Sequence, residues 1–432
     1  MYDSAIINGK VFTLGEFIKT NVYILNGRIS CLSTEVYPTI KVYDAANRLV
    51  IPGLIDPHVH FALEGKVTSV DDFYQGSVCA AFGGVTTIID FLDPISQAKD
   101  IRHALTKRKK LAEKSIVDYS FHLTVKNPQK VKEIVNKMEF YHLKSVKLFT
   151  TYSDSNRRTY DPEIEELLAY SSIKDYIVMA HVEKDTLIDL NPTFEVPDLK
   201  RSRPSQAESE EARHLADMVK RTKGKLYMVH LSSGKTLAML TKNYSELINT
   251  SFFIESCPHY FVLSDLKLDE PNNYLYTMAP PLRSEEEMIL LHNQFDQVFS
   301  IGTDHCAYTS ADKHHTYLKD IPLGVGGIEH SFDLMYQHFG EACIEKMTLN
   351  PALVFGLYPK KGHINVGADA DIMIYDPMYQ HVIKKGHSNS DYTVYEDMLV
   401  SGKVESTMVG GEFIMERGEL KGGHGKYVFD YE

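Results

Sequence analysis

From Arg48 onward, apolar runs rich in β-branched residues alternate with amphipathic stretches of helical length, and this alternation limits the possible folds more than any other feature. Runs that are apolar throughout are typical of parallel strands buried on both faces. The stretches between them, such as residues 206–221 and 284–295, have helical periodicity. The eight runs cover residues 49–55, 85–91, 117–125, 145–152, 176–182, 226–231, 251–255 and 298–303. Eight strand–helix units predict an α/β protein with a (β/α)8 barrel of the TIM type, rather than an open sheet.

Both ends of the chain have a different pattern, in which short strand segments are separated by turn residues. Near the N-terminus, Gly9, Gly15 and Gly27 separate predicted strands at residues 5–7, 11–13, 21–24 and 28–31. Near the C-terminus, strand-forming residues occur at 372–375 and 404–409. The simplest arrangement pairs the two ends in one small β-sandwich. We therefore predict a β-sandwich domain of residues 1–50 plus 364–432 and a barrel domain of residues 51–363.

Composition and charge exclude several classes of partner. The net charge is −12 and the basic residues are scattered, so we expect no nucleic acid partner. No run approaches the roughly 20 apolar residues that span a membrane, and the first residues lack the features of a signal peptide. The five cysteines are odd in number and form no CxxC pair, which indicates reduced thiols. We expect a cytoplasmic protein.

Polar side chains lie at the ends of five predicted barrel strands. His58 and His60 are two residues apart, so both point to the same side of an extended strand. Lys147 interrupts an apolar strand, where an ammonium is unfavourable unless it is paired or chemically altered. Three further strands end in His181, His230 and Asp304. Because barrel chemistry takes place at the carboxyl ends of the strands, these six residues predict a metal site.

Short motifs occur in a fixed order along nearly the whole chain. They are Asn8-Gly9, GLIDPHVH (53–60), ESCPHY (255–260), PPLR (280–283), GTDHC (302–306), NPA (350–352), FGLYP (355–359) and GADAD (367–371). In these motifs the chain resembles the cyclic amidohydrolases, and most closely their hydantoinase and dihydropyrimidinase branch.

The resemblance implies a cofactor of two divalent metal ions. In such enzymes the lysine of the fourth strand is carbamylated by CO2, which would turn Lys147 into a bridging anion. The first ion would then be bound by His58, His60, Lys147 and Asp304, and the second by Lys147, His181 and His230. Nitrogen and oxygen ligands suit Zn2+, which we expect, and also Mn2+, Co2+ or Fe2+.

The resemblance also implies that a metal-bridging hydroxide attacks a cyclic amide and opens its ring. Asp304 would act as general base and then as general acid toward the leaving ring nitrogen. Tyr152, five residues past Lys147, matches the tyrosine that faces the substrate carbonyl in hydantoinases. The expected substrate is a hydantoin, a dihydropyrimidine or a related cyclic ureide. Relatives are commonly tetramers, so we expect a homotetramer by analogy.

Two positions depart from the hydantoinase pattern. Hydantoinases usually have a serine before the Pro-Pro pair and an asparagine before the loop glycine, and both serve the ring amide of the substrate. Here these substrate-binding positions are Ala279 and Leu323. Backbone groups can still bind the ring, but Leu323 removes a polar partner and adds bulk. The sequence therefore does not determine the preferred substrate.

Several alternatives remain at this stage. Allantoinase is one, because residues 257–260 and 279–281 also resemble its motifs. Dihydroorotase is disfavoured, because its family has an arginine where this chain has Ala62. A non-catalytic dihydropyrimidinase-related scaffold would have lost metal ligands, and a deacetylase-like enzyme is a further alternative. His259 either orients substrate or caps its strand, and Cys306 is interpreted as a packing residue.

Overall fold

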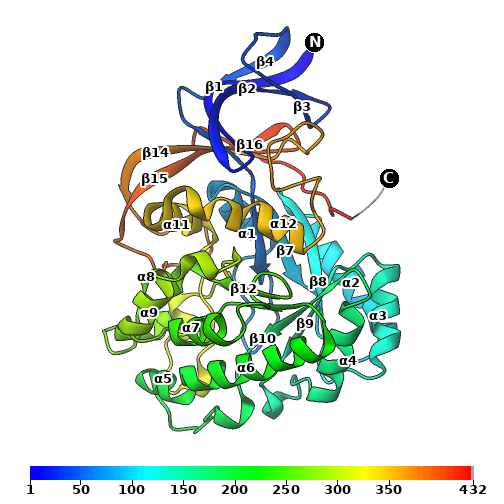
Figure 1. The fold of residues 1–432 in the computed structure, drawn as a ribbon. Helices are drawn as coiled ribbons and strands as arrows, with labels where there is room; N and C mark the ends of the chain where they lie inside the picture. Colours follow the sequence, from blue (N-terminus) through cyan, green and yellow to red (C-terminus); the bar gives the residue numbers. More distant parts are fainter. Residues whose placement is uncertain (430–432) are drawn as a thin grey trace.

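The computed structural model describes residues 1–429 and contains an eight-stranded parallel sheet that forms a TIM-like barrel (Figure 1). Its strands are paired in sequence order. They are β6 (Leu54–Val59), β7 (Val85–Phe91), β8 (Asp118–Thr124), β9 (Ser145–Phe149), β10 (Ile177–His181), β11 (Leu226–Met228), β12 (Phe252–Ser256) and β13 (Ser300–Ile301). A parallel bridge between Val59 in β6 and His305, four residues past β13, joins the two edges, so the sheet closes on itself.

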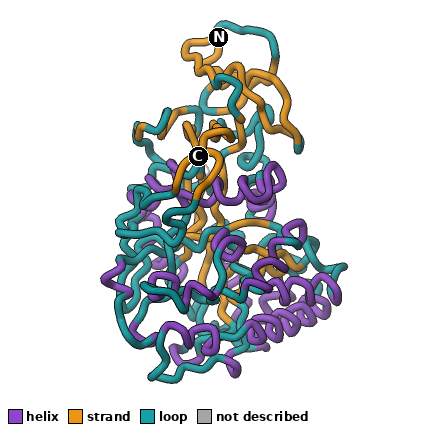
Figure 2. Tube along the Cα trace, turned by 90° about the vertical axis from the view of Figure 1, so that its left-hand side faces the viewer, coloured by secondary structure: helices purple, strands orange, loops and turns teal. Residues whose placement is uncertain are grey.

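Helices surround the barrel (Figure 2). They are α1 (Phe73–Phe82), α2 (Ile101–Ala112), α3 (Val131–Phe140), α4 (Asp161–Ser171), α5 (Leu199–Ser202), α6 (Ser205–Thr222), α7 (Gly234–Asn243), α8 (Pro258–Val262), α9 (Glu285–His292), α10 (Ser310–Lys313), α11 (Ser331–Phe339) and α12 (Leu349–Val354). Helices α1 to α9 lie between the barrel strands in sequence, and α10 to α12 follow the last barrel strand. The predicted helices at 206–221 and 284–295 correspond to α6 and α9. Within residues 1–429, no helix combines the length and the apolar character needed to cross a membrane.

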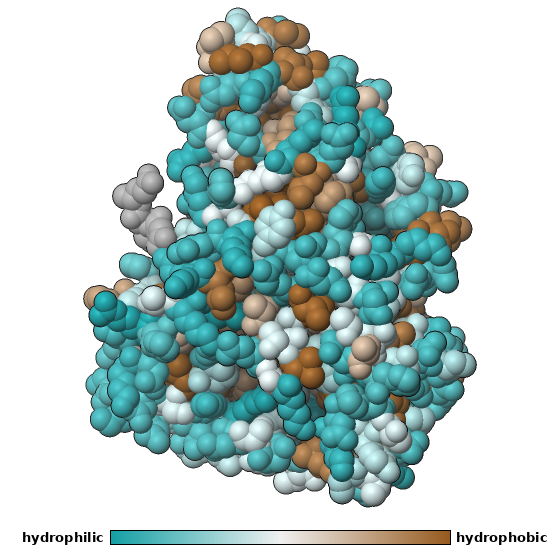
Figure 3. Space-filling view, turned by 180° about the vertical axis from the view of Figure 1, so that it is seen from behind, coloured by the Kyte–Doolittle hydropathy of each residue, from teal (hydrophilic) through white to brown (hydrophobic). Residues whose placement is uncertain are grey.

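The N- and C-terminal strands form a second, mixed sheet at one end of the molecule. It contains β1 (Tyr2–Thr13), β2 (Glu16–Leu25), β3 (Arg28–Ser33), β4 (Thr39–Asp44), β5 (Leu49–Pro52), β14 (Ile372–Val382), β15 (Leu399–Val409), β16 (Glu412–Glu416) and β17 (Glu419–Leu420). The antiparallel pairing of β5 with β14 connects the two ends of the chain. Apolar side chains from both ends, including Ile6, Val22 and Ile372, pack into one small core. Figure 3 shows further apolar side chains on the outer surface of this sheet.

Three strand predictions need correction. Residues 49–55, predicted as one barrel strand, are divided at Gly53 into β5 and β6. A side chain at Gly53 would come within 2.2 Å of Thr86, and the Gly53 amide donates to Asp371 O, so the chain leaves one sheet for the other there. Segments 5–7 and 11–13 are parts of one strand, β1, with a register shift between Ile6 and Gly9. Strand β4 was not predicted, although Ile40 and Val42 alternate with polar residues, and both side chains are exposed.

A buried lysine connects the barrel to the terminal sheet. Lys361 Nζ lies 2.6 Å from Asp118 in β8, 2.5 Å from Asp371 and 3.3 Å from Asp369. The carboxylates compensate the charge of the buried ammonium, which would otherwise be strongly unfavourable.

Candidate metal centre

Barrel closure brings together three predicted ligands from the two edge strands. Asp304 Oδ1 lies 3.2 Å from Nε2 of His58 and 3.1 Å from Nε2 of His60. One ligand atom from each residue lies within 4.8 Å of the others, which is close enough to hold one metal ion. Asp304 has a positive φ of 50°, an unusual backbone conformation for a residue other than glycine. The cluster of His58, His60 and Asp304 therefore has the donor set of a metal site.

A second histidine pair lies beside this cluster. His181 ends β10, and His230 follows β11 by two residues. Nδ1 of His181 lies 3.0 Å from Nε2 of His230, and both side chains are buried. The ring centres of His58 and His230 are 5.4 Å apart, so the two groups are adjacent.

Lys147 lies in β9, between β8 and β10, and is 2% exposed. Its ammonium nitrogen is 5.3 Å from the ring centre of Phe91 and 5.5 Å from that of Phe149. Among residues 1–429, no hydrogen bond or ion pair to this nitrogen is found. Burial lowers the pKa of Lys147 to about 8, although Asp304 and Glu255 act in the opposite direction. A buried amine with this pKa is partly neutral near physiological pH, and a neutral amine is the form that reacts with CO2.

The electrostatics favour the protonation states that metal ligands need. Burial lowers the pKa of His60, His181 and His230 below the ordinary value, so these imidazoles are neutral with a free lone pair. Burial alone would raise the pKa of Asp304, but His58 and His60 outweigh burial and lower it. Asp304 is therefore an ionised carboxylate over the physiological pH range.

Glu255, at the end of β12, orients the His58 ring and holds the backbone of His230. Its Oε1 lies 2.7 Å from Nδ1 of His58 and accepts the backbone N–H of His230 at 3.0 Å. Its Oε2 accepts the hydroxyl of Tyr227 at 2.8 Å. These contacts leave Nε2 of His58 facing Asp304. Glu255 was noted in the sequence only as part of a motif. A carboxylate at the end of a buried strand was the signal for this role.

A second carboxylate supports the other side of the site. Glu183 Oε2 lies 2.6 Å from Nε2 of His181, so Nδ1 of that ring faces His230. Arg203 forms a buried ion pair with Glu183, with Nη2 2.5 Å from Oε2. Burial opposes the ionisation of Glu183, but Arg203 and His181 outweigh it and lower the pKa of Glu183. The sequence did not predict either residue at the site: Glu183 is one residue past the predicted strand 176–182, and Arg203 lies in no predicted strand.

Tyr152 lies at the rim of the histidine pair. Its ring centre is 5.2 Å from that of His181, and the guanidinium carbon of Arg203 is 5.0 Å from the tyrosine ring. Burial raises the pKa of Tyr152, while Arg203 acts in the opposite direction. The phenol is therefore neutral and can donate a hydrogen bond.

Ala279 and Leu323 are half-buried and lie on two loops that contact each other. The Gly324 amide donates to Thr277 O at 3.1 Å, and Val325 forms a parallel bridge with His305. The structure thus brings both positions next to the segment that carries Asp304.

Two further residues noted in the sequence are buried at this end of the barrel. Within residues 1–429, neither ring nitrogen of His259 has a hydrogen-bond partner, and burial lowers the pKa of His259 to about 4. Burial raises the pKa of the Cys306 thiol to about 12. A thiol of such high pKa is a poor nucleophile, in agreement with a packing role.

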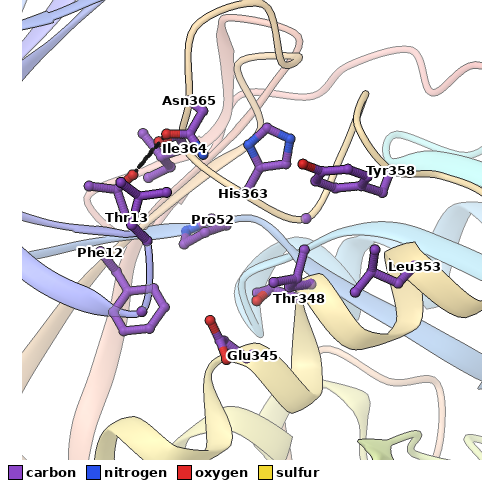
Figure 4. A pocket seen from close by; sticks show the side chains of 14 residues that line it. Phe12, Thr13, Pro52, Glu345, Thr348, Leu353, Tyr358, His363, Ile364 and Asn365 are labelled. Atoms are coloured by element: carbon purple, nitrogen blue, oxygen red, sulfur yellow. Dashed lines mark hydrogen bonds between the residues drawn. The ribbon is translucent and has the colours of Figure 1, made fainter. Parts of the chain in front are cut away.

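A cavity of about 320 Å³ lies elsewhere, between the terminal sheet and the barrel (Figure 4). Thr13, Glu345, Tyr358 and His363 are among the residues that line it. The six candidate ligands do not line this cavity, so it is separate from the metal centre.

Comparison with known proteins agrees with this geometry. The sequence matches the amidohydrolase family over residues 49–414. The chain belongs to the amidohydrolase superfamily. It is 31% identical to a D-hydantoinase of Streptomyces coelicolor, with 98% of this chain and 97% of the relative covered. It is 30% identical to a D-hydantoinase of Geobacillus stearothermophilus, with 98% and 95% covered.

Solved structures give the same result. The fold of this amidohydrolase superimposes on the crystal structure of dihydropyrimidinase from Brevibacillus agri with a TM-score of 0.92, 26% sequence identity and 98% of each chain covered. The L-hydantoinase (dihydropyrimidinase) of Arthrobacter aurescens has the same fold, with a TM-score of 0.88, 24% identity and 99% of each chain covered. The two D-hydantoinase relatives confirm the hydantoinase and dihydropyrimidinase branch of the superfamily. Both solved structures confirm the TIM-like barrel. The chain is a hydantoinase-like cyclic amidohydrolase.

Proposed function

We propose that this amidohydrolase uses two divalent metal ions, expected to be Zn2+, to open the ring of a hydantoin, a dihydropyrimidine or a related cyclic ureide. The observation that carries the proposal is the convergence of His58, His60 and Asp304 beside the pair of His181 and His230. These residues lie at the ends of four strands, and together they offer imidazoles and an ionised carboxylate.

The residues present fit a pair of metal ions. His58, His60 and Asp304 would hold one ion, and His181 and His230 would hold the other. Lys147 would bridge the two as a carbamate, because its buried amine has no acceptor within the described residues and burial lowers its pKa to about 8. When bound, such ions supply Lewis-acid activation of water and of an amide carbonyl.

The side chains of this chain would then perform the remaining steps. Asp304 would accept a proton as water oxygen bonds to the ring carbonyl carbon, and would deliver that proton to the ring nitrogen as the C–N bond breaks. The neutral phenol of Tyr152 would donate a hydrogen bond to the carbonyl oxygen as negative charge develops there. Arg203 lies beside the tyrosine ring and would help to fix it in this position.

Allantoin is the second candidate substrate. Two observations favour it: Ala279 and Leu323 replace the expected polar side chains, and His259 is buried with both ring nitrogens unpartnered within residues 1–429. A polar substituent on the ring could receive the hydrogen bonds that His259 does not make inside the protein.

The test is a substrate screen of the purified protein, loaded with Zn2+ in bicarbonate buffer. Hydantoin, 5-substituted hydantoins, dihydrouracil, allantoin and dihydroorotate are compared, and ring opening is followed by loss of ultraviolet absorbance and by mass spectrometry. Elemental analysis on the same samples should give about two metal ions per chain. Metal-loaded protein that opens none of the rings would refute the proposed function.

A further inference from the structure

Lys313, the last residue of α10, is a fully buried lysine without a carboxylate partner among the described residues. Its Nζ donates to three backbone carbonyls, Gly324 O at 2.7 Å, Thr277 O at 2.8 Å and Leu275 O at 3.2 Å. An ammonium has three N–H donors, so each donor has one acceptor. The geometry therefore fits the charged amine, although no carboxylate of residues 1–429 pairs with it.

These carbonyls belong to two loops, residues 275–279 and 322–325, which we call the ring loops. The Gly324 amide donates to Thr277 O at 3.1 Å, so the ring loops contact each other directly. Lys313 adds one bond to the second loop and two to the first. The ring loops carry Ala279 and Leu323, the positions at which hydantoinases have polar side chains for the ring amide.

The second ring loop also lies against the segment that follows Asp304. The Cys306 amide donates to Val325 O at 2.9 Å. A side chain at Gly324 would come within 2.9 Å of Cys306 O, so the backbones are in close contact. A shift of this loop would therefore change its distance from Asp304.

We propose that Lys313 is a positioning residue that fixes the ring loops at the edge of the metal centre, so that their backbone groups can bind the ring amide of the substrate. The inference rests on the proposed function. Ala279 and Leu323 offer no polar side-chain atom, so recognition of the ring amide depends on backbone N–H and C=O groups. Such groups select a ligand only when their supporting contacts keep them within about 0.5 Å of the productive position.

Charge burial argues against a purely structural role for Lys313. Burial lowers the pKa of Lys313 to about 7, with only Cys306 acting in the opposite direction. An apolar side chain of similar length would fill the same space without the cost of burying a charge. What the amine adds is the set of bonds to the ring loops.

The test compares Lys313→Met with Lys346→Met. Lys346 also donates to backbone carbonyls, those of Val298 and Asp296, but these precede β13 at the opposite end of its strand. For Lys313→Met we expect KM for the best cyclic amide to rise about tenfold or more, with kcat within about threefold and unchanged metal content, because substrate binding is lost rather than chemistry. Lys346→Met should leave KM unchanged.

Hydrogen exchange provides a readout that does not require turnover. In Lys313→Met, the amide of Gly324 should exchange about tenfold faster or more, while Lys346→Met should leave it protected. Lys313→Gln, which keeps two donors, should give intermediate values in both measurements.

These outcomes separate the two proposals. If wild-type protein opens no cyclic amide, the proposed function fails, and exchange at Gly324 still tests the loop contacts. If KM is unchanged, if kcat and metal content fall together, or if both Lys313 variants fail to fold, Lys313 serves the fold alone and this inference is wrong.

Discussion

Two buried clusters in this amidohydrolase each contain a lysine and several potential metal ligands, but they differ in what faces the lysine. The first cluster lies where the barrel meets the terminal sheet, and we call it the seam. There the Lys361 ammonium forms ion pairs with Asp118, Asp369 and Asp371. At the metal centre, Lys147 faces aromatic rings and has no hydrogen-bond acceptor within the described residues.

In each cluster three ligand atoms lie close enough together to hold a metal ion. At the seam the ammonium of Lys361 already occupies that position, so the three aspartates need no metal. At the metal centre the candidate ligands are imidazoles and one carboxylate, and the lysine amine has no partner among residues 1–429. Between these two clusters, the lysine without a partner therefore indicates function, and the lysine paired with carboxylates indicates structure.

Removal of the unpaired lysine is the strongest test of this contrast. Lys147→Ala should lose most bound metal and reduce activity by more than about 10³-fold, because the bridging anion is lost while the fold is retained. Lys144→Ala, which removes a half-buried lysine that pairs with Asp175 in the same region, is the control. Elemental analysis that found two metal ions per chain in Lys147→Ala would contradict the bridging role.

Asp304→Asn should have the next largest effect. The amide cannot accept a proton, so kcat should fall by about 10²–10⁴-fold, the range typical of a general base. Circular dichroism should show an intact fold. A kcat close to that of the wild type would remove Asp304 from the proton transfer.

At the seam, the expected effect is on stability rather than on activity. Lys361→Met leaves buried carboxylates without a counter-charge, which should destabilise the protein by about 3–5 kcal/mol. Denaturant unfolding measures this loss, and the exposed neighbour in Lys360→Met serves as control. A variant as stable as the wild type would show that the seam does not need its lysine.

The two lysines should also respond differently to pH. Burial lowers the pKa of Lys147 to about 8 from an ordinary 10.5, so its unfavourable contribution to stability is complete below about pH 8 and disappears as the pH rises to about 10.5. Burial opposes protonation of Lys361 too, but its aspartates raise its pKa above the ordinary value. Its stabilising contribution therefore persists across the same pH range.

Metal-free, CO2-free wild-type protein should therefore gain up to about 3 kcal/mol relative to Lys147→Met between pH 8 and 10.5. Unfolding by urea at several pH values measures the difference. A difference between the two proteins that does not change with pH would mean that the amine of Lys147 is not buried in its charged form.

The contrast also explains what could be predicted from the sequence. Strand ends are visible as the last residue of an apolar run, so His58, His181 and Asp304 were identified from the strand pattern. Lys147 was found because a charge inside an apolar strand is unusual. The fold followed from the same runs, because each strand of a parallel barrel is buried on both faces.

Other features depend on contacts between distant segments. Glu183 and Arg203 form their ion pair between a strand end and the start of a helix, and neither residue is unusual in its local sequence. The division of residues 49–55 depends on how closely Gly53 approaches Thr86, which no periodicity shows. Lys313 lies in a polar segment of the sequence, which gives no sign of burial. Its burial depends on three carbonyls from two distant loops.

The smallest expected effect concerns Glu255. Its carboxylate has hydrogen-bond partners, as the carboxylates of the seam do, but it lies at the metal centre. Glu255→Gln keeps the shape of the side chain but weakens its contacts with His58 and the His230 amide, so metal affinity should fall by about 10–100-fold. Glu287→Gln, at a buried glutamate that contacts serines instead, should not change the affinity. Competition with a metal chelator measures both values. An unchanged affinity in Glu255→Gln would mean that the barrel backbone alone orients His58. Glu255 would then serve only the stability of the fold, as the carboxylates of the seam do.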